Sequence, residues 1–134
     1  MARGIDVGIY LRPGIPDEPF VAGALGNLAA LELERERGET LEWQVLRVEG
    51  SRPHHYRLVV RHPARALDLG LRGNLGRVLD QLSAESSEEL RAKLRAAVAA
   101  GAKPVALRTV RDEVDFWQDD FWTFLGGPMG FGPI

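Results

Sequence analysis

Residues 41–62, LEWQVLRVEGSRPHHYRLVVRH, contain the pattern that decides the fold. Apolar residues alternate with polar ones over 41–49 and again over 55–62, and a turn-forming segment, Gly-Ser-Arg-Pro, separates the two runs. Alternation with a period of two is typical of strands, and two such runs around a short turn predict a β-hairpin. Within the first run the apolar positions switch faces after Val45, which indicates a bulge or burial on both faces.

Further elements flank the hairpin on both sides. Upstream, alternation predicts a strand, and an apolar stripe predicts a helix that Gly38 ends; downstream, two helices precede a last strand. The predicted elements occupy residues 4–12, 17–37, 41–49, 55–62, 73–82, 86–101 and 104–110. This β-α-β-β-α-β order with an inserted helix is that of a ferredoxin-like α+β sandwich, in which helices cover one face of an antiparallel sheet. We predict one domain over residues 1–111.

Small residues lie along one side of the helix predicted over 17–37, at Gly23, Gly26 and Ala30. A glycine inside a helix costs about 1 kcal/mol relative to alanine. We therefore expect the backbone of this helix to approach a neighbouring element closely at these positions.

Residues 112–124 combine five carboxylates with five aromatic residues, and a glycine-rich apolar tip follows to residue 134. Placed on a helix, Val114, Trp117 and Phe121 fall in one apolar stripe, whereas Phe116 and Trp122 flank it. We predict an appended amphipathic α-helix over 114–125 that packs on the domain or on a dimer partner. The aromatic residues predicted to bind a partner are Phe116, Trp117, Phe121, Trp122 and Phe124.

Composition restricts the class of protein. The chain has 134 residues, a net charge of −2, 45% hydrophobic residues and no cysteine. These values are typical of a soluble globular domain, argue against whole-protein attraction to nucleic acid, and exclude disulfides and thiol catalysis. No apolar run is long enough to span a membrane, so we expect a cytoplasmic protein. Fifteen arginines against two lysines fit a GC-rich, thermophilic source.

The three histidines of the chain are its candidate imidazole ligands for a metal ion. His54 and His55 are adjacent and point to opposite faces of a strand, and His62 lies about 26 Å from His54 along an extended chain. This spacing does not fit a metal site, and we predict neither a metal nor a cofactor.

Glycines precede the first downstream helix in the segment Gly70-Leu71-Arg72-Gly73. Backbone N–H groups in such a loop can approach a phosphate, and Arg77 flanks it. The motif resembles the GxxG loop of KH RNA-binding domains, although a leucine stands where a basic or polar residue is usual. The resemblance implies RNA binding in this loop. The outward strand residues Arg57 and Arg61 would extend the surface.

Three functions remain open from sequence. We predict an interaction module without enzymatic activity that self-associates as a dimer. The first alternative is RNA binding through Gly70, Arg72, Gly73, Arg77, Arg57 and Arg61. The second is a small enzyme or ligand-binding domain with a pocket between sheet and helices. No serine lies in a GxSxG motif, and the sequence contains no recognisable pair of a nucleophile and a general base. It therefore identifies no catalytic residue.

Overall fold

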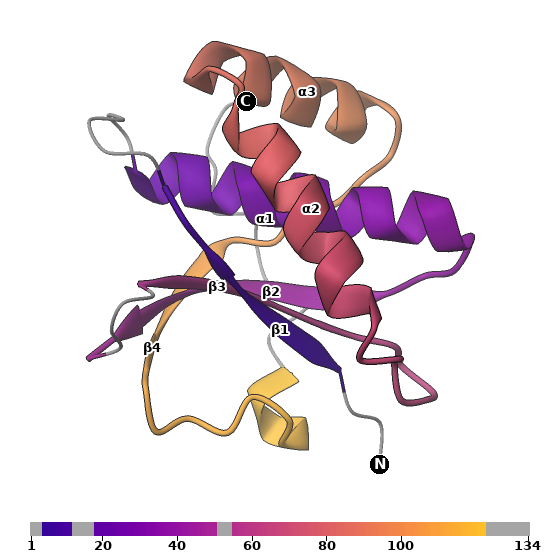
Figure 1. Cartoon of the computed structure of the whole chain (residues 1–134), viewed down its shortest axis with the longest axis vertical. Helices are drawn as coiled ribbons and strands as arrows, with labels where there is room; N and C mark the ends of the chain where they lie inside the picture. Colours follow the sequence, from indigo (N-terminus) through magenta and orange to yellow (C-terminus); the bar gives the residue numbers. More distant parts are fainter. Residues whose placement is uncertain (1–3, 12–17, 51–54, 123–134) are drawn as a thin grey trace.

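A computed structural model of the protein describes residues 4–11, 18–50 and 55–122 (Figure 1). One mixed sheet contains four strands in the order β1-β3-β2-β4. The first three strands in this order pair antiparallel, and β4 pairs parallel with β2. Their bounds are β1 Ile5–Ile9, β2 Glu42–Glu49, β3 Tyr56–Arg61 and β4 Leu107–Arg111.

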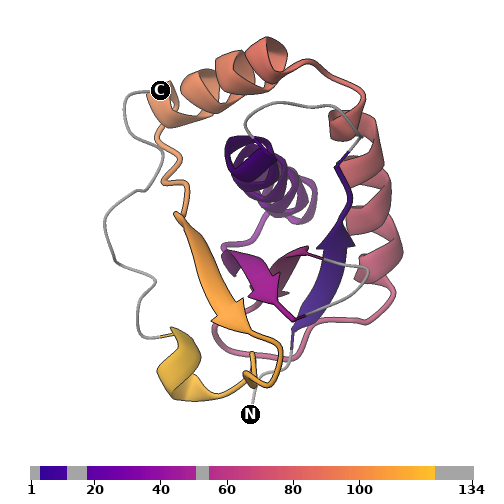
Figure 2. The same ribbon diagram turned by 90° about the vertical axis from the view of Figure 1, so that its left-hand side faces the viewer.

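Three α-helices lie on one face of this sheet. Helix α1 lies next to the sheet, and α2 and α3 pack around its outer side, so that α1 is seen end-on in the middle of Figure 2. A short 3-10 helix, η1, lies below the opposite face (Figures 1 and 2). The bounds are α1 Glu18–Arg37, α2 Leu71–Ser83, α3 Ser87–Ala99 and η1 Asp119–Trp122. None of the described helices is long and apolar enough to cross a membrane.

The predicted hairpin over 41–62 is confirmed. Strands β2 and β3 pair in continuous register from Glu42 opposite Arg61 to Arg47 opposite Tyr56. The switch of apolar positions in β2 reflects burial on both faces rather than a bulge. Val45 faces the core beneath the helices, and Leu46 belongs to a second apolar cluster on the opposite face.

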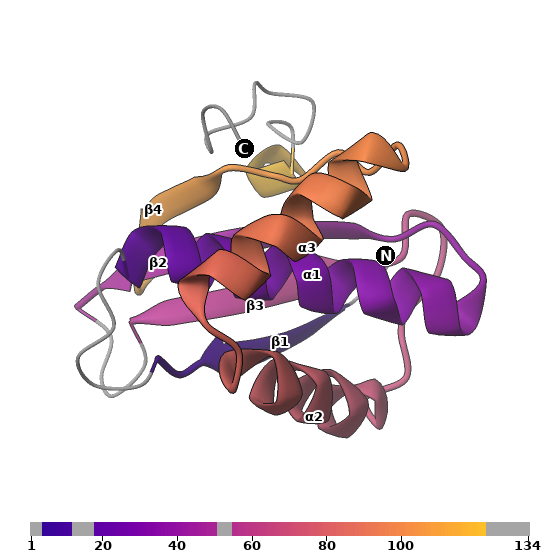
Figure 3. The same ribbon diagram turned by 90° about the horizontal axis from the view of Figure 1, so that it is seen from above.

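The α+β class is confirmed, but the ferredoxin-like topology is not, because β4 pairs parallel with β2 in a sheet that was predicted to be antiparallel. Two helices of 13 residues each, α2 and α3, separate β3 from β4. The first carries the chain about 20 Å across the molecule and the second carries it back. The chain therefore enters β4 from the end of the sheet where β3 stops, which makes β4 parallel to β2. Figure 3 shows β4 and β1 at opposite edges of the sheet.

Close packing of α1 on the sheet is confirmed at Gly26. A Cβ atom at this position would lie 2.6 Å from Cγ2 of Val45 in β2, closer than such contacts occur in real structures. The missing side chain therefore lets the helix backbone rest directly on the sheet.

Asn27 follows this glycine and is completely buried. Its amide oxygen accepts hydrogen bonds from Trp43 Nε1 at 2.9 Å and from the backbone N–H of Val105 at 2.8 Å. Its amide nitrogen donates to the carbonyl oxygens of Val105 at 3.0 Å and Gly23 at 2.8 Å. All four hydrogen-bonding positions of the side-chain amide are thus used. The residue ties α1 to β2 and to the segment that leads into β4.

The α-helix predicted over 114–125 is wrong for the described residues, because 112–118 contain turns, a bend and irregular backbone, and η1 follows them. Hydrogen bonds from side chains replace the backbone hydrogen bonds that a helix would form in this segment. The carbonyl oxygen of Phe121 accepts from Gln44 Nε2 at 3.0 Å and from Arg108 Nη1 at 2.9 Å. The indole of Trp122 donates to the carbonyl oxygen of Phe116 at 2.5 Å. Residues 123–125 of the predicted helix lie outside the described residues.

Candidate functional site

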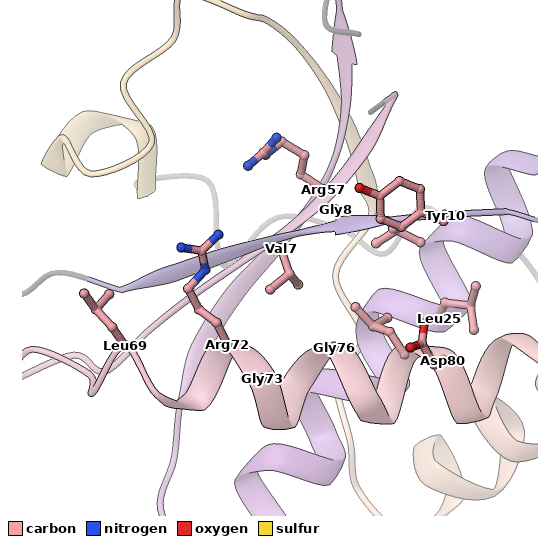
Figure 4. A pocket seen from close by; sticks show the side chains of 12 residues that line it. Val7, Gly8, Tyr10, Leu25, Arg57, Leu69, Arg72, Gly73, Gly76 and Asp80 are labelled. Carbon is pink, nitrogen blue, oxygen red and sulfur yellow. The ribbon is translucent and has the colours of Figure 1, made fainter. Parts of the chain in front are cut away.

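A groove of about 620 Å³ runs between strand β1 and helix α2 (Figure 4). One wall is formed by β1 and the residue that follows it, and the other by the exposed side of α2. Leu25 of α1 and Leu79 of α2 also line the groove, and both are almost completely buried in the core. The remaining lining residues are Val7, Gly8, Ile9, Tyr10, Arg57, Leu69, Arg72, Gly73, Gly76 and Asp80.

The strand wall is an edge of the sheet. Among the described residues, β1 pairs only with β3, through a register that runs from Ile5 opposite Val60 to Ile9 opposite Tyr56. An edge strand directs about half of its backbone N–H and C=O groups away from its one neighbour. The groove therefore has one wall that can form backbone hydrogen bonds with a further strand.

The helix wall carries glycines in place of side chains. Helix α2 packs on the domain through Leu71, Leu75 and Val78, and Gly73 and Gly76 lie on its groove side. No heavy atom lies within 4 Å of the position that a Cβ atom would take at either glycine. The space beside the edge of β1 is therefore left open by the helix.

The two ends of the groove differ in charge. Leu69 and Arg72 lie at the end near the start of β1, and Tyr10 and Asp80 lie at the other end (Figure 4). Leu69 and Tyr10 are 68% and 62% exposed, and these are the two largest exposures of large hydrophobic residues in the described chain. Arg72 and Asp80 are also exposed, and neither forms an ion pair with another described residue. The groove thus has a cationic end and an anionic end, each beside an exposed apolar side chain.

The residues proposed for RNA binding are only partly brought together. Gly70, Arg72 and Gly73 lie at or near the groove, whereas Arg77 lines a different cleft, between the three helices. The predicted glycine-rich loop is wrong, because α2 begins at Leu71 and places Gly73 in its first turn. The helix begins there because Leu71 and Leu75 are buried one turn apart.

The two strand arginines are engaged within the chain. Arg57 forms an ion pair with Asp6 across β1 and β3, with Nε 3.1 Å from Oδ2. Arg61 pairs with Glu42 at 2.7 Å, and its guanidinium lies 4.3 Å from the centre of the Trp122 ring. These charges are therefore balanced locally, which leaves less positive charge for a nucleic-acid backbone.

The described aromatic residues among those predicted to bind a partner lie far from the groove, on the opposite face of the sheet. Phe121 and Trp122 are buried there, and Phe116 and Trp117 are half-buried against the same cluster. The rings of Trp117 and Trp122 stack with centres 6.3 Å apart. Phe124 lies outside the described residues. Self-association through this segment stays a prediction.

The other candidate sites are less complete. The cleft between the helices, about 530 Å³, is lined by Glu32, Glu36, Arg77, Glu85 and Lys93, and the last two form an ion pair. His55 and His62 stand at the two ends of β3, and His54 lies outside the described residues. Within the described ranges, no group of three histidine, aspartate or glutamate side chains is placed to hold a metal ion.

The sequence allowed a pocket between sheet and helices but did not locate this groove, and three of its residues, Tyr10, Leu69 and Asp80, were not identified. A signal was available in Gly73 and Gly76, which stand three residues apart inside a helical pattern and therefore share one face. Comparisons of the chain with protein-family models, with curated proteins and with solved structures found no match. Function is therefore inferred from the groove itself.

Proposed function

We propose that the protein is a polypeptide-binding module without enzymatic activity, and that it takes an extended segment of a partner into the groove between β1 and α2. One observation carries this proposal: an edge strand lies across a groove from a helix that has glycines, Gly73 and Gly76, on its groove side and open space beside them. Addition of a strand to an exposed sheet edge is a recurring mode of peptide recognition.

The geometry of strand addition fits the groove. An added strand lies about 4.8 Å from its neighbour, and its side chains point alternately to the two faces of the sheet. On the helix face, those side chains meet the open space beside Gly73 and Gly76 and the half-buried side chain of Val7. The backbone of the ligand supplies affinity, at about 0.5–1.5 kcal/mol net for each hydrogen bond, and the alternate side chains supply selectivity.

The charges of the groove favour a polypeptide over a nucleic acid. A phosphate backbone requires several cations along one surface. The groove instead offers one exposed cation, Arg72, and one exposed anion, Asp80, at opposite ends. A polypeptide can present both signs, and a nucleic-acid backbone cannot.

The proposal is tested with a library of random heptapeptides displayed on phage, selected against the whole chain. Peptides that bind the wild type should lose binding to Gly76→Leu, because a leucine side chain there enters the groove. They should retain binding to Ala92→Leu, a matched change on the exposed side of α3. Backbone amide resonances of Ile5–Ile9 should shift on titration with a selected peptide. Selected peptides that bind Gly76→Leu as well as they bind the wild type would contradict the proposal.

A further inference from the structure

The ends of the groove define what kind of segment it accepts, provided that the proposed function is correct. Arg72 and Asp80 are eight residues apart on α2, which corresponds to about 12 Å along a helix. In an extended strand, residues four apart are separated by about 13 Å and lie on the same face. Two charged side chains spaced i and i+4 in a ligand strand therefore match the two charges of the groove.

The residue between these two, at i+2, also faces the helix. It lies opposite the stretch of α2 that contains Gly73 and Gly76, where the missing side chains leave room. The half-buried side chain of Val7 borders that room and offers apolar surface to a ligand (Figure 4). A large apolar side chain at i+2 would cover this surface and exclude water from it, which favours leucine or a similar residue.

Charge complementarity fixes the order of the two charged residues once the strand direction is set. Antiparallel pairing is slightly more stable per residue than parallel pairing. Strand β1 runs from the Arg72 end of the groove to the Asp80 end (Figure 4). A ligand that pairs antiparallel with β1 therefore passes Asp80 first and Arg72 last, so its basic residue precedes its acidic one.

We infer that the groove recognises an extended segment of the form basic-x-apolar-x-acidic, with Lys or Arg against Asp80, a large apolar residue over Gly73 and Gly76, and Glu or Asp against Arg72. The segment adds to β1 as an antiparallel strand. No bond of the ligand is broken, so the interaction is reversible binding.

The test compares two synthetic peptides of equal composition. The first is Thr-Lys-Thr-Leu-Thr-Glu-Thr and the second is Thr-Glu-Thr-Leu-Thr-Lys-Thr, both with blocked ends. Binding to the whole chain is measured by fluorescence polarisation or calorimetry at low salt. We expect the first peptide to bind about tenfold more tightly, because two exposed charge pairs change from attractive to repulsive between the two peptides.

A doubly reversed groove provides the decisive comparison. In the variant Arg72→Glu/Asp80→Lys the order of charges along α2 is exchanged while the net charge is kept, and both positions are exposed, so the fold is retained. The preference should switch to the second peptide. The charge reversal Arg95→Glu, on the exposed side of α3, is the control and should leave the preference unchanged.

The outcomes separate this inference from the proposed function. If the two peptides bind the wild type equally and the variant Arg72→Glu/Asp80→Lys equally, or if the preference does not switch between these two proteins, the inferred motif is wrong. If phage-selected peptides still require the open groove at Gly76, strand addition itself stands and only the motif fails. If binding of selected peptides is also indifferent to Gly76→Leu, the groove is not the binding site and both ideas fail.

Discussion

Helices α1 and α2 both carry glycines in their interiors, but the glycines have opposite surroundings. Gly26 of α1 lies directly against Val45 of the sheet, and a Cβ atom there would be 2.6 Å from the valine. Gly73 and Gly76 of α2 have no heavy atom within 4 Å of the same position. Each glycine costs about 1 kcal/mol of helix stability. Packing offsets that cost in α1, whereas in α2 it is offset by nothing within the described chain, as expected for a surface kept open for a ligand.

The largest expected loss of stability comes from replacing a buried polar residue of α1, which tests how tightly this helix is bound to the fold. Replacement Asn27→Ala should destabilise the protein by about 3 kcal/mol or more, because Trp43 Nε1 and both backbone groups of Val105 lose their buried partners. Urea unfolding measures the change. The matched replacement Asn74→Ala on α2 should change stability by less than about 0.5 kcal/mol. Equal effects at the two asparagines would mean that α1 is no more tightly bound to the fold than α2.

The next effect concerns the glycine of α1. Gly26→Ala should destabilise by about 1–3 kcal/mol, since a methyl group must displace Val45, which is completely buried and stiff. The double variant Gly26→Ala/Val45→Ala removes the obstructing γ-carbons. Its loss of unfolding free energy should therefore be smaller than the sum of the two single losses. Additive losses would show that the close contact with Val45 is not what excludes a side chain at this position.

In α2 the same substitution should have the opposite sign. Gly73→Ala and Gly76→Ala should each stabilise the protein by about 0.5–1 kcal/mol, because alanine is the better helix former and nothing obstructs its methyl group. Thermal unfolding of the two variants beside the wild type measures this gain. Destabilisation by either alanine would mean that the open space is needed by the fold itself, and the contrast between the two helices would be lost.

Local patterns in the sequence predicted the elements well and their arrangement less well. The hairpin and the three α-helices follow from periodicity and from capping signals such as Ser86 with Glu89, which form a capping box at the start of α3. The edge occupied by β4 depends on how two successive helices fold back over the sheet, which no local pattern specifies. The strand order was therefore the least accessible part of the fold.

The candidate site was harder to predict for the same reason. The glycines of α1 and α2 look alike in the sequence. Only tertiary packing shows that Val45 fills the space where a side chain at Gly26 would lie, and that the same space at Gly76 is open. The segment after β4 shows the converse. Its pattern predicts an α-helix, but Gln44 and Arg108 bind the carbonyl oxygen of Phe121 and hold the chain in another conformation. Long-range contacts of this kind override local helix propensity.

The smallest expected effect lies at the end of α1, where the helix leaves the core and becomes as exposed as the outer side of α2. Arg35 there is 70% exposed at its side chain and pairs with Glu32 one turn earlier. The hydrogen bond from Arg35 is the main cause that holds the pKa of Glu32 below its usual value of 4.5. A lowered pKa in the folded state means that the pair stabilises the protein above that value and that this contribution is lost as the pH falls through the folded pKa.

Because the pair is exposed, solvent and salt screen it, and its contribution to the free energy of unfolding near neutral pH should be small. A double-mutant cycle with Glu32→Gln and Arg35→Gln, followed by urea unfolding at pH 7 and again at pH 2.5, measures the coupling directly. We expect a small favourable coupling at pH 7 that is reduced at the lower pH, where Glu32 takes up a proton. A coupling of several kcal/mol at pH 7 would mean that the end of α1 is as firmly held as the part around Gly26 and Asn27. The contrast between a tightly packed helix and an exposed one would then fail, because the exposed end of α1 would be held as firmly as its buried part.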